Sequence, residues 1–385
     1  MKHSTERILT THTGSLPRPH ALLDLMKARI DGEAVDDAAY DARLREAVAG
    51  IVREQIEHGV DVVTDGEQSK LGFSAYVNQR LAGFEERPRP RAGSFAAEMA
   101  TFPEYYEQYF ARAMTGGRVL ARPAPLTCVG PISYRGQEAV RRDIANLQAA
   151  VQGVNAAEAF MPAIAASHIG NNEYYRTEEE FLAALADAMH EEYQAIVDAG
   201  FLLQLDDPGF AGVYSNPEFD AAEQRRQGGL AVEAINHALR GIPAERVRFH
   251  TCYGINEGPR VHDAPLSGMV DMILKINAGA YSFEAANARH EHEYHVWENV
   301  KLPEGKVLIP GVITHASNIV EHPELIAERI TRYAERVGRE NVIASTDCGF
   351  SSQATYTPEV QPRVMWAKFQ AMAEGARLAS EQLWR

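Results

Sequence analysis

The sequence predicts an α/β fold, a TIM (β/α)8 barrel with an inserted lid or arm segment. Short apolar runs alternate with helical patterns along most of the chain, which is typical of parallel βαβ units. The length of 385 residues suits one large barrel with insertions or two ordinary domains. Because the alternation continues along the chain, we expect a single barrel domain over residues 1–385.

Nine apolar runs are candidate strands, and an eight-stranded barrel has room for all but one of them. They span residues 8–11, 60–64, 125–129, 160–165, 201–205, 247–252, 280–284, 307–312 and 342–345. Prolines crowd the run 125–129, and proline is poorly tolerated inside a sheet. We therefore expect residues 125–129 to form an accessory strand.

Helical stripes with recognisable ends separate these runs. Apolar residues recur at helical spacing over residues 37–58, and Gly59 follows as a stop. Thr177 and Glu180 predict a capping box at the start of a second helix. Pro323 suits the first position of a third helix, which should end before Gly338. Residues 358–384 predict a closing helix.

One long segment, residues 84–122, breaks the alternation. It contains the run Arg-Pro-Arg-Pro-Arg at 87–91 and then an aromatic cluster of Phe102, Tyr105, Tyr106, Tyr109 and Phe110. An insertion of this length in a compact barrel is typically a lid or an interface arm. A contact between copies of a homo-oligomer explains the segment equally well.

Composition limits the classes of partner. A formal net charge of −15 disfavours nucleic acid and anionic membranes, which attract basic proteins, so a small molecule is the expected partner. No apolar segment approaches the roughly 20 residues needed to span a bilayer, and we expect a cytoplasmic protein. The three cysteines lack a disulfide-type spacing, which favours reduced thiols available to a metal.

Four metal-binding residue types fall at the ends of candidate strands. His250 and Cys252 are two positions apart, so both side chains point to the same face of their strand. Glu284 and Cys348 end or follow two further strands, and zinc takes about four such ligands. One alternative is that the cysteines and His250 are inert core residues. Another is a purely structural zinc, although such sites usually use closely spaced ligand pairs.

The charge of this ligand set indicates its chemistry. Two thiolates and a carboxylate would leave a zinc site at about −1, which favours keeping a bound sulfur electron-rich over making hydroxide. A substrate thiol, with an ordinary pKa near 8.5, could then bind as thiolate and attack an electrophilic carbon. Glu284 is the hardest ligand, and we expect it to yield its place to the thiol.

Other polar residues at strand ends have candidate roles in substrate binding and proton transfer. His315 is suited to protonate a leaving group, or is a hydrogen-bonded histidine at the barrel mouth. Glu67 and Asp206 could hold an ammonium group, while Ser15 with the backbone beside it could hold a carboxylate. Alternatively, Asp206 or Asp207 caps a helix.

Two further features give weaker signals. The alternating charges over residues 289–295 are more typical of a solvated helix start than of a metal site. His168, Asn171 and Asn172 follow the strand 160–165 and could face the electrophile.

Seven segments together resemble the catalytic barrel of the cobalamin-independent methionine synthase family. They are Thr-His-Thr-Gly-Ser-Leu-Pro-Arg-Pro at 11–19, Thr-Asp-Gly-Glu at 64–67, Gln-Leu-Asp-Asp-Pro at 204–208, His-Thr-Cys-Tyr at 250–253, Ser-Phe-Glu at 282–284, Pro-Gly-Val-Ile-Thr-His-Ala-Ser at 310–317 and Asp-Cys-Gly at 347–349. The resemblance implies a TIM barrel with zinc on His250, Cys252, Glu284 and Cys348. It also implies His315 as the acid and homocysteine contacts at Ser15, Glu67 and Asp206.

The chain is similar in length and motifs to the single-barrel branch of that family, which includes epoxyalkane:coenzyme M transferase. Where the family places a tryptophan against the pterin of its folate donor, this sequence has Ser-His-Ile-Gly-Asn-Asn-Glu-Tyr-Tyr at 167–175. We therefore expect a zinc-dependent transfer of a methyl or alkyl group to a thiol such as homocysteine. The alternatives are epoxide opening by a small thiol, a metal-dependent hydrolase or decarboxylase, and a zinc-stabilised binding protein without turnover.

Overall fold

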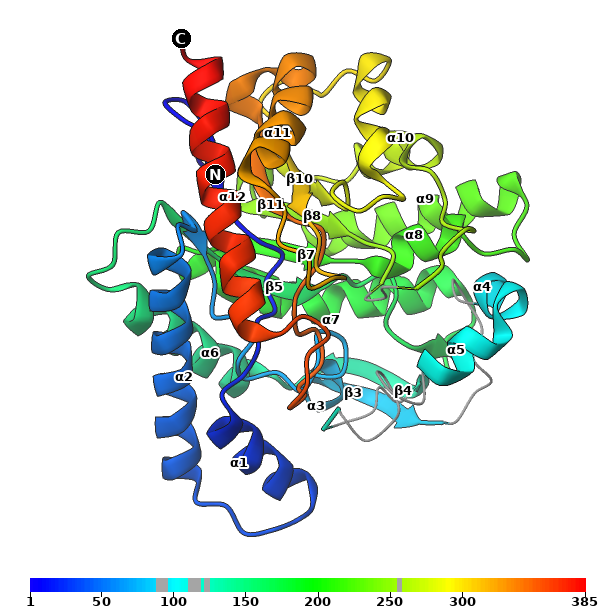
Figure 1. Ribbon diagram of the computed structural model, residues 1–385. Helices are drawn as coiled ribbons and strands as arrows, with labels where there is room; N and C mark the ends of the chain where they lie inside the picture. Colours follow the sequence, from blue (N-terminus) through cyan, green and yellow to red (C-terminus); the bar gives the residue numbers. More distant parts are fainter. Residues whose placement is uncertain (88–95, 110–118, 121–124, 255–257) are drawn as a thin grey trace.

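The computed structural model describes residues 1–87, 96–109, 119–120, 125–254 and 258–385, and a parallel eight-stranded sheet lies at its centre (Figure 1). In spatial order the strands are β1 (Leu9–Thr10), β11 (Ile343–Thr346), β10 (Val307–Ile313), β9 (Ala280–Phe283), β8 (Val247–Thr251), β7 (Leu202–Asp206), β5 (Glu158–Ile164) and β2 (Val62–Val63). The Asp61 amide donates to the Thr10 carbonyl at 3.1 Å, which links the β1 and β2 ends of the sheet. The predicted barrel is therefore confirmed, with a strand at each of the eight expected runs.

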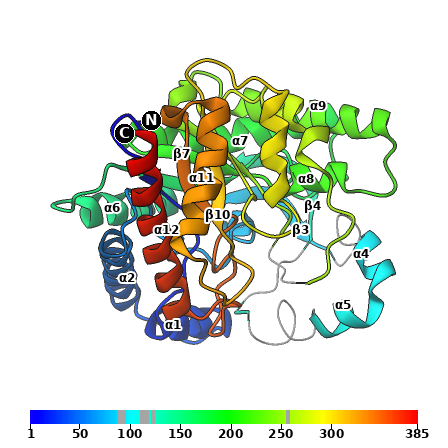
Figure 2. The same ribbon diagram turned by 45° about the horizontal axis from the view of Figure 1, so that its top comes forward.

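Helices on the outside of the sheet complete the βα units. The α-helices are α1 (His20–Ile30), α2 (Asp37–Glu57), α3 (Val77–Arg80), α4 (Ala96–Thr101), α5 (Pro103–Tyr109), α6 (Gln137–Val151), α7 (Glu178–Asp198), α8 (Pro208–Tyr214), α9 (Ala221–Ala238), α10 (Val270–Ile273), α11 (Pro323–Val337) and α12 (Pro362–Leu383). Short 3-10 helices are η2 (Ala244–Arg246), η3 (Leu266–Gly268), η4 (Glu291–Glu298) and η5 (Arg339–Asn341). The α11 and α12 helices pack side by side, as the turned view in Figure 2 also shows. Within the described residues, none of the helices combines the length and apolar character that crossing a bilayer requires.

The predicted helix ends are correct with two adjustments. Thr177 caps α7 by accepting a 3.2 Å hydrogen bond from the Glu180 amide. The Glu180 carboxylate, however, accepts from the amide of Arg176 and not of Thr177, so the predicted capping box is shifted by one residue on that side. The closing helix α12 starts at Pro362 instead of Pro358, because Gln361 supplies the cap through bonds to the next backbone amides.

A small second sheet lies beside the barrel. The run predicted as an accessory strand is β4 (Leu126–Tyr134), which pairs antiparallel with β3 (Leu81–Glu86) and parallel with β6 (Asn171–Asn172). The sequence reasoning missed β3 and β6. The second half of β3 falls in the segment that was assigned to an insertion, and β6 has only two residues, too few for a periodic pattern.

The described part of the insertion packs on loops at one end of the barrel. The Tyr106 hydroxyl donates to the Pro259 carbonyl at 2.8 Å, and the Tyr109 hydroxyl donates to Glu359 at 2.6 Å. The Leu120 amide bonds the Ala354 carbonyl at 2.9 Å. These loops follow β8 and β11, so the insertion braces both of them. Phe110 and the proline-arginine run at 88–91 lie outside the described residues.

A buried ion cluster joins the accessory sheet to α7. Arg80 pairs with Asp143 and lies 3.0 Å from Glu192, and all three side chains are less than a tenth exposed. Tyr76 and Tyr134 donate to the Glu192 carboxylate at 2.9 and 2.5 Å. Burial alone would raise the pKa of Glu192, but the charge of Arg80, followed by that of Lys70 and the hydrogen bond from Tyr134, outweighs burial and leaves that pKa lowered. The cluster therefore depends on a single guanidinium.

Arg80→Met should destabilise the fold by about 3–5 kcal/mol, since it leaves two buried carboxylates without their cation. Urea unfolding followed by circular dichroism measures the change. The control is Arg377→Met, which removes exposed pairs with Glu374 and Glu381 and should leave the midpoint unchanged. Equal effects of the two substitutions would contradict a structural role for the buried cluster.

Candidate metal and substrate site

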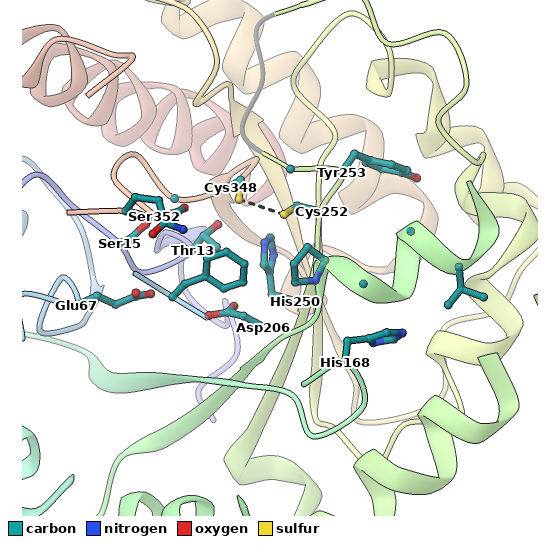
Figure 3. Close-up of a pocket in the computed structure, with 18 of the residues that line it drawn as sticks. Thr13, Ser15, Glu67, His168, Asp206, His250, Cys252, Tyr253, Cys348 and Ser352 are labelled. Atoms are coloured by element: carbon teal, nitrogen blue, oxygen red, sulfur yellow. Dashed lines mark hydrogen bonds between the residues drawn. The ribbon is translucent and has the colours of Figure 1, made fainter. Parts of the chain in front are cut away.

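A cavity of about 670 Å³ opens at the carboxyl ends of the barrel strands. Its walls come from segments that follow β1, β2, β5, β7, β8 and β11. Figure 3 labels the polar and aromatic residues that define it: Thr13, Ser15, Glu67, His168, Asp206, His250, Cys252, Tyr253, Cys348 and Ser352. This is the end of a TIM barrel where active sites form.

Three of the four predicted metal ligands meet in this cavity. The Cys252 and Cys348 sulfurs lie 3.2 Å apart, and one ligand atom from each of His250, Cys252 and Cys348 falls within 4.8 Å of the others. Cys252 directly follows β8 and Cys348 lies two positions after β11. Since β9 and β10 separate these two strands within the sheet, the cysteines meet across the barrel mouth.

The three side chains fit a soft cation such as zinc. His250 Nε2 is buried and has no hydrogen-bond partner among the described residues, while its Nδ1 lies 3.2 Å from the Ser282 hydroxyl. A second partner of this kind orients a metal-ligating imidazole. Burial first, then the charges of Arg248 and His315, lowers the pKa of His250 to about 3, so the ring is in the neutral form that metals bind. Sulfur and imidazole together are a typical zinc donor set.

Glu284, the predicted fourth ligand, lies outside that group of three. Its Oε1 accepts from the Tyr253 amide at 2.8 Å. Its Oε2 accepts from Asn287 at 2.8 Å and from Arg289 at 3.2 Å. Burial, followed by the charge of Asp347, raises the pKa of Glu284 to about 7. Glu284 therefore has a complete set of protein partners here, and its role as a ligand stays a prediction.

His315 is buried at the barrel mouth, with 1% of its surface exposed, and is not among the residues that line the cavity. Burial, then the charges of Arg289 and Lys368, lowers the pKa of His315 to about 3. The turn that carries His315 is anchored by Glu321, which accepts from the Thr314 amide at 2.8 Å and pairs with Lys368 at 2.6 Å. At neutral pH the imidazole therefore holds no proton to spare, and its predicted role as an acid stays untested.

Glu67 and Asp206 form a buried pair of acidic groups on the cavity wall. They are 2% and 6% exposed. Burial raises the pKa of Glu67 against the opposing charges of Lys70 and Arg18. Burial, and then the neighbouring Glu67, raises the pKa of Asp206 well above its ordinary value. Glu67 Oε2 has no partner among the described residues, so this pair can accept a cationic group such as an ammonium.

The backbone at Glu67 is held in an unusual conformation. Its φ of 56° is the only positive value at a non-glycine residue in the described chain. Such a conformation costs energy and persists where its surroundings enforce it. Asp65 accepts from the Glu67 amide at 2.9 Å, and Arg18 donates to the Glu67 carbonyl at 2.8 Å. Gly14 leaves space for the carboxylate, because a Cβ there would lie 3.3 Å from Glu67 Oε1.

Ser15 lies against the turn that carries Cys348. Its hydroxyl is 3.3 Å from the Ser352 hydroxyl, and a Cβ on Gly349 would approach the Ser15 oxygen to 2.0 Å. Gly349 is therefore required for Ser15 to pack here. In Figure 3, Ser15 and Glu67 lie on one side of the sulfur pair. This arrangement brings two predicted substrate contacts next to the predicted metal ligands.

Asp207 caps a helix, which was the alternative role predicted for Asp206 or Asp207. It caps α8 by accepting from the Phe210 amide at 2.9 Å. The same side chain lies 2.8 Å from Nδ1 of His168 and accepts from the Ser167 hydroxyl at 2.5 Å. Asp206 instead accepts from Gln204 at 2.8 Å and faces the cavity. The two adjacent aspartates thus have different surroundings.

The prediction of a solvated helix start over residues 289–295 is wrong for its central residues. His290 and Glu293 are 3% and 4% exposed and belong to a buried cluster with Asp263. The His290 ring stacks on Tyr253, with centroids 4.0 Å apart. The error arose because charge alternation does not reveal that Asp263, from a distant loop, packs on this turn. In the described chain, the only metal-type cluster is the one at His250.

The sequence reasoning missed one wall of the cavity. It consists of Pro208, Gly209, Gly212, Val213, Asn216 and Phe219. These residues belong to α8 and the turn after it, and α8 has only seven residues, too few for a clear periodic signal. The glycines at 209 and 212 were the available signal, because a residue without a side chain lets other groups approach a helix closely.

Comparison with known proteins identifies the family. The family model described as the cobalamin-independent synthase catalytic domain matches residues 8–158 and 164–368. The chain belongs to this family. The match covers the segments that carry all eight predicted site residues, which confirms the family resemblance drawn from the motifs.

Relatives of similar length align with nearly the whole chain. The chain is 24% identical to a methionine synthase of Saccharolobus islandicus over 381 residues, covering 98% of this chain and 96% of that protein. It is also 24% identical to a methionine synthase of Thermococcus kodakarensis, over 98% of this chain and 94% of that protein. A B12-independent methionine synthase from Shewanella sp. W3-18-1, solved in complex with selenomethionine, superposes with a TM-score of 0.73 at 18% identity, covering 98% of this chain and 99% of that one. That superposition supports the fold.

His290 should make stability depend on pH. Burial lowers its pKa, but Asp263 and Glu293 outweigh burial and raise it from 6.5 to about 9. Protonated His290 therefore stabilises the fold fully below pH 6.5, and this contribution is lost as pH rises through about 9. The difference in unfolding free energy between wild type and His290→Gln should shrink between pH 6.5 and 10 in urea titrations. His295→Gln, at an exposed pair with Glu298, is the control, and a similar pH trend for it would contradict the assignment.

Proposed function

We propose that this protein is a zinc-dependent thiol S-methyl or S-alkyl transferase whose acceptor is homocysteine. The observation that carries the proposal is one cavity that holds both a His-Cys-Cys cluster and a buried acidic pair with an unsatisfied oxygen. Family membership supports transferase chemistry, and the relatives above bear the name methionine synthase.

We assign His250, Cys252 and Cys348 as zinc ligands, with Glu284 as the fourth ligand in the absence of thiol. Zinc on two sulfurs and an imidazole would lower the pKa of a substrate thiol and keep the resulting thiolate nucleophilic. Glu284 is the ligand suited to leave, because Tyr253, Asn287 and Arg289 already offer its oxygens hydrogen bonds. Its departure from a metal would therefore leave no buried carboxylate unpartnered.

The rest of the acceptor amino acid fits the side of the cavity near Ser15. An ammonium group between Glu67 and Asp206 would satisfy two buried carboxylates at once and shift both pKa values back down. A carboxylate could accept from the hydroxyls of Ser15 and Ser352. The thiol would then extend toward Cys252 and Cys348, which lie next to this subsite in Figure 3.

His315 keeps its assignment to proton transfer on this proposal. Because its pKa is lowered to about 3, the ring is neutral at rest and gives up a proton only after it has received one. The thiol proton released on binding is the available source. His315 would thus act from behind the cavity wall, close enough to His250 for its charge to affect the pKa of that ring.

Epoxide opening by a small thiol is the nearest alternative. Coenzyme M has a sulfonate and no amine, so it would leave Glu67 and Asp206 facing each other without a cation. A hydrolase or decarboxylase is favoured less, because two sulfur ligands polarise water weakly. A binding protein without turnover is favoured less, because the matching family model describes a synthase catalytic domain.

Removal of a ligand should abolish zinc binding and leave the fold intact. Cys348→Ser should weaken zinc binding by more than about 100-fold, because a first ligand matters at least as much as the outer partners that cost 10–100-fold. Zinc content by mass spectrometry and competition with a chelator measure this effect. Cys128→Ser, at a thiol that bonds the Gly130 carbonyl in the small sheet, is the control and should keep one zinc per chain. Unfolding of Cys348→Ser would instead favour a structural zinc.

The acidic pair should determine thiol selectivity. With methyl iodide as a probe donor, the zinc-loaded protein should methylate homocysteine much faster than the free thiol reacts, as followed by methionine formation. Glu67→Gln and Asp206→Asn should each lower kcat/KM for homocysteine by about 10- to 100-fold, the value of one charged hydrogen bond. Neither substitution should affect 4-mercaptobutanoate, which lacks the amine.

Two results would contradict the proposal. If the wild-type protein does not accelerate methylation of homocysteine, the proposed function is wrong. If both thiols lose rate equally in Glu67→Gln, the acidic pair does not hold the amine.

A further inference from the structure

The cavity continues past the sulfur pair into a second half that the acceptor does not occupy. This half is walled by α8 and by His168, which follows β5. In Figure 3, His168 lies on the opposite side of His250 from Ser15 and Glu67. The wall contains Pro208, Val213 and Phe219, together with the glycines Gly209 and Gly212. A second substrate that meets the thiol sulfur at the cluster therefore has to come from this side.

His168 is held so that one ring nitrogen is left for that substrate. Its Nδ1 lies 2.8 Å from Asp207 and 3.2 Å from the Ser167 hydroxyl. The His168 side chain is 30% exposed, whereas Asp207 is 1% exposed and is fixed further by Ser167 and the Phe210 amide. With Nδ1 bound to a buried carboxylate, Nε2 is the nitrogen available to the cavity. A carboxylate behind an imidazole sets its tautomer and stabilises its protonated form.

Gly209 is required for this placement. A Cβ at this position would lie 2.4 Å from His168 Cγ and 2.8 Å from its Cβ. The imidazole can therefore lie against the first turn of α8 only because residue 209 is a glycine. None of the contacts described for the acceptor side of the cavity requires a glycine at position 209.

We propose that His168, oriented by Asp207, protonates the departing half of the donor, and that the donor carries its alkyl group on an oxygen or nitrogen atom. This inference rests on the proposed function and names the donor class for the same site. The thiolate sulfur forms a bond to the alkyl carbon as the bond from that carbon to the oxygen or nitrogen breaks. The electron pair stays on the leaving atom, which takes the proton from Nε2. His168 then regains a proton from water.

The charges around His168 favour this role. Burial lowers its pKa, but the carboxylate of Asp207 outweighs burial and, with a smaller contribution from Glu178 at the start of α7, raises the pKa. Arg226 of α9 faces Glu178 and partly balances it. By contrast, the pKa of His315 is lowered to about 3 and its ring does not line the cavity. His168 is thus the histidine at the donor's position whose surroundings favour the protonated form.

A pair of probe donors tests the proposal. 1,2-Epoxypropane releases an alkoxide that has to be protonated, whereas methyl iodide releases iodide, which does not. With zinc-loaded protein and homocysteine, His168→Gln should lower the rate with epoxypropane by about 100-fold or more, the usual contribution of a general acid. The rate with methyl iodide should stay within about twofold of the wild-type rate. His315→Gln is the comparison variant and should not show this dependence on the leaving group.

A measurement independent of turnover accompanies the kinetics. Imidazole resonances of His168 followed by NMR should titrate with a pKa above 6.5 in the wild type, and Asp207→Asn should lower that pKa. Equal losses with both donors in His168→Gln, or leaving-group dependence in His315→Gln alone, would overturn the proposal. A wild-type protein that accelerates neither reaction would instead contradict the proposed function itself.

Discussion

The approach of Cys252 to Cys348 across the barrel mouth is the contact on which the site depends. The two sulfurs are 3.2 Å apart although 96 positions separate them in the chain. Neither strand could bring them together alone, because β9 and β10 lie between β8 and β11. Curvature of the sheet into a cylinder turns the two strand ends toward one axis. The chemistry of the cavity is therefore a consequence of barrel closure.

Buried polar groups in this protein are of two kinds. Near α7, Arg80 is placed between Asp143 and Glu192, and the charges are balanced within the chain. In the cavity, His250 Nε2 and Glu67 Oε2 are buried without protein partners. Leaving such atoms unpaired costs roughly 1–3 kcal/mol each, so a protein retains them where a ligand supplies the partner. On the proposed function, these unpaired atoms are the ones that a cation and an ammonium group would bind.

Most of the barrel could be predicted from the sequence, because buried parallel strands produce apolar runs and helices end at glycine or begin at capping residues. The proposed ligands His250, Cys252 and Cys348 could also be brought together, since residues at the carboxyl ends of parallel strands share one mouth. The distances between side chains within that mouth could not be predicted. Strand spacing does not reveal that Tyr253, Asn287 and Arg289 hold Glu284 in a separate network.

Features that depend on contacts between distant loops also could not be predicted from the sequence. Helix α8, which forms one wall of the cavity, is too short to give a helical period in the sequence. His168 gave only a weak signal, because its contact with Asp207 is not visible in the sequence. Residues 289–295 looked solvated because Asp263, their partner, lies in another loop. In each case the missing information was which distant segment packs against the residues in question.

X-ray absorption at the zinc edge, before and after addition of homocysteine, would show whether a substrate thiol joins Cys252 and Cys348 on one zinc ion. We expect two sulfur ligands in the zinc-loaded protein and three once homocysteine is bound, with loss of an oxygen ligand. Zinc bound without sulfur, or a sulfur count that homocysteine leaves unchanged, would contradict this expectation.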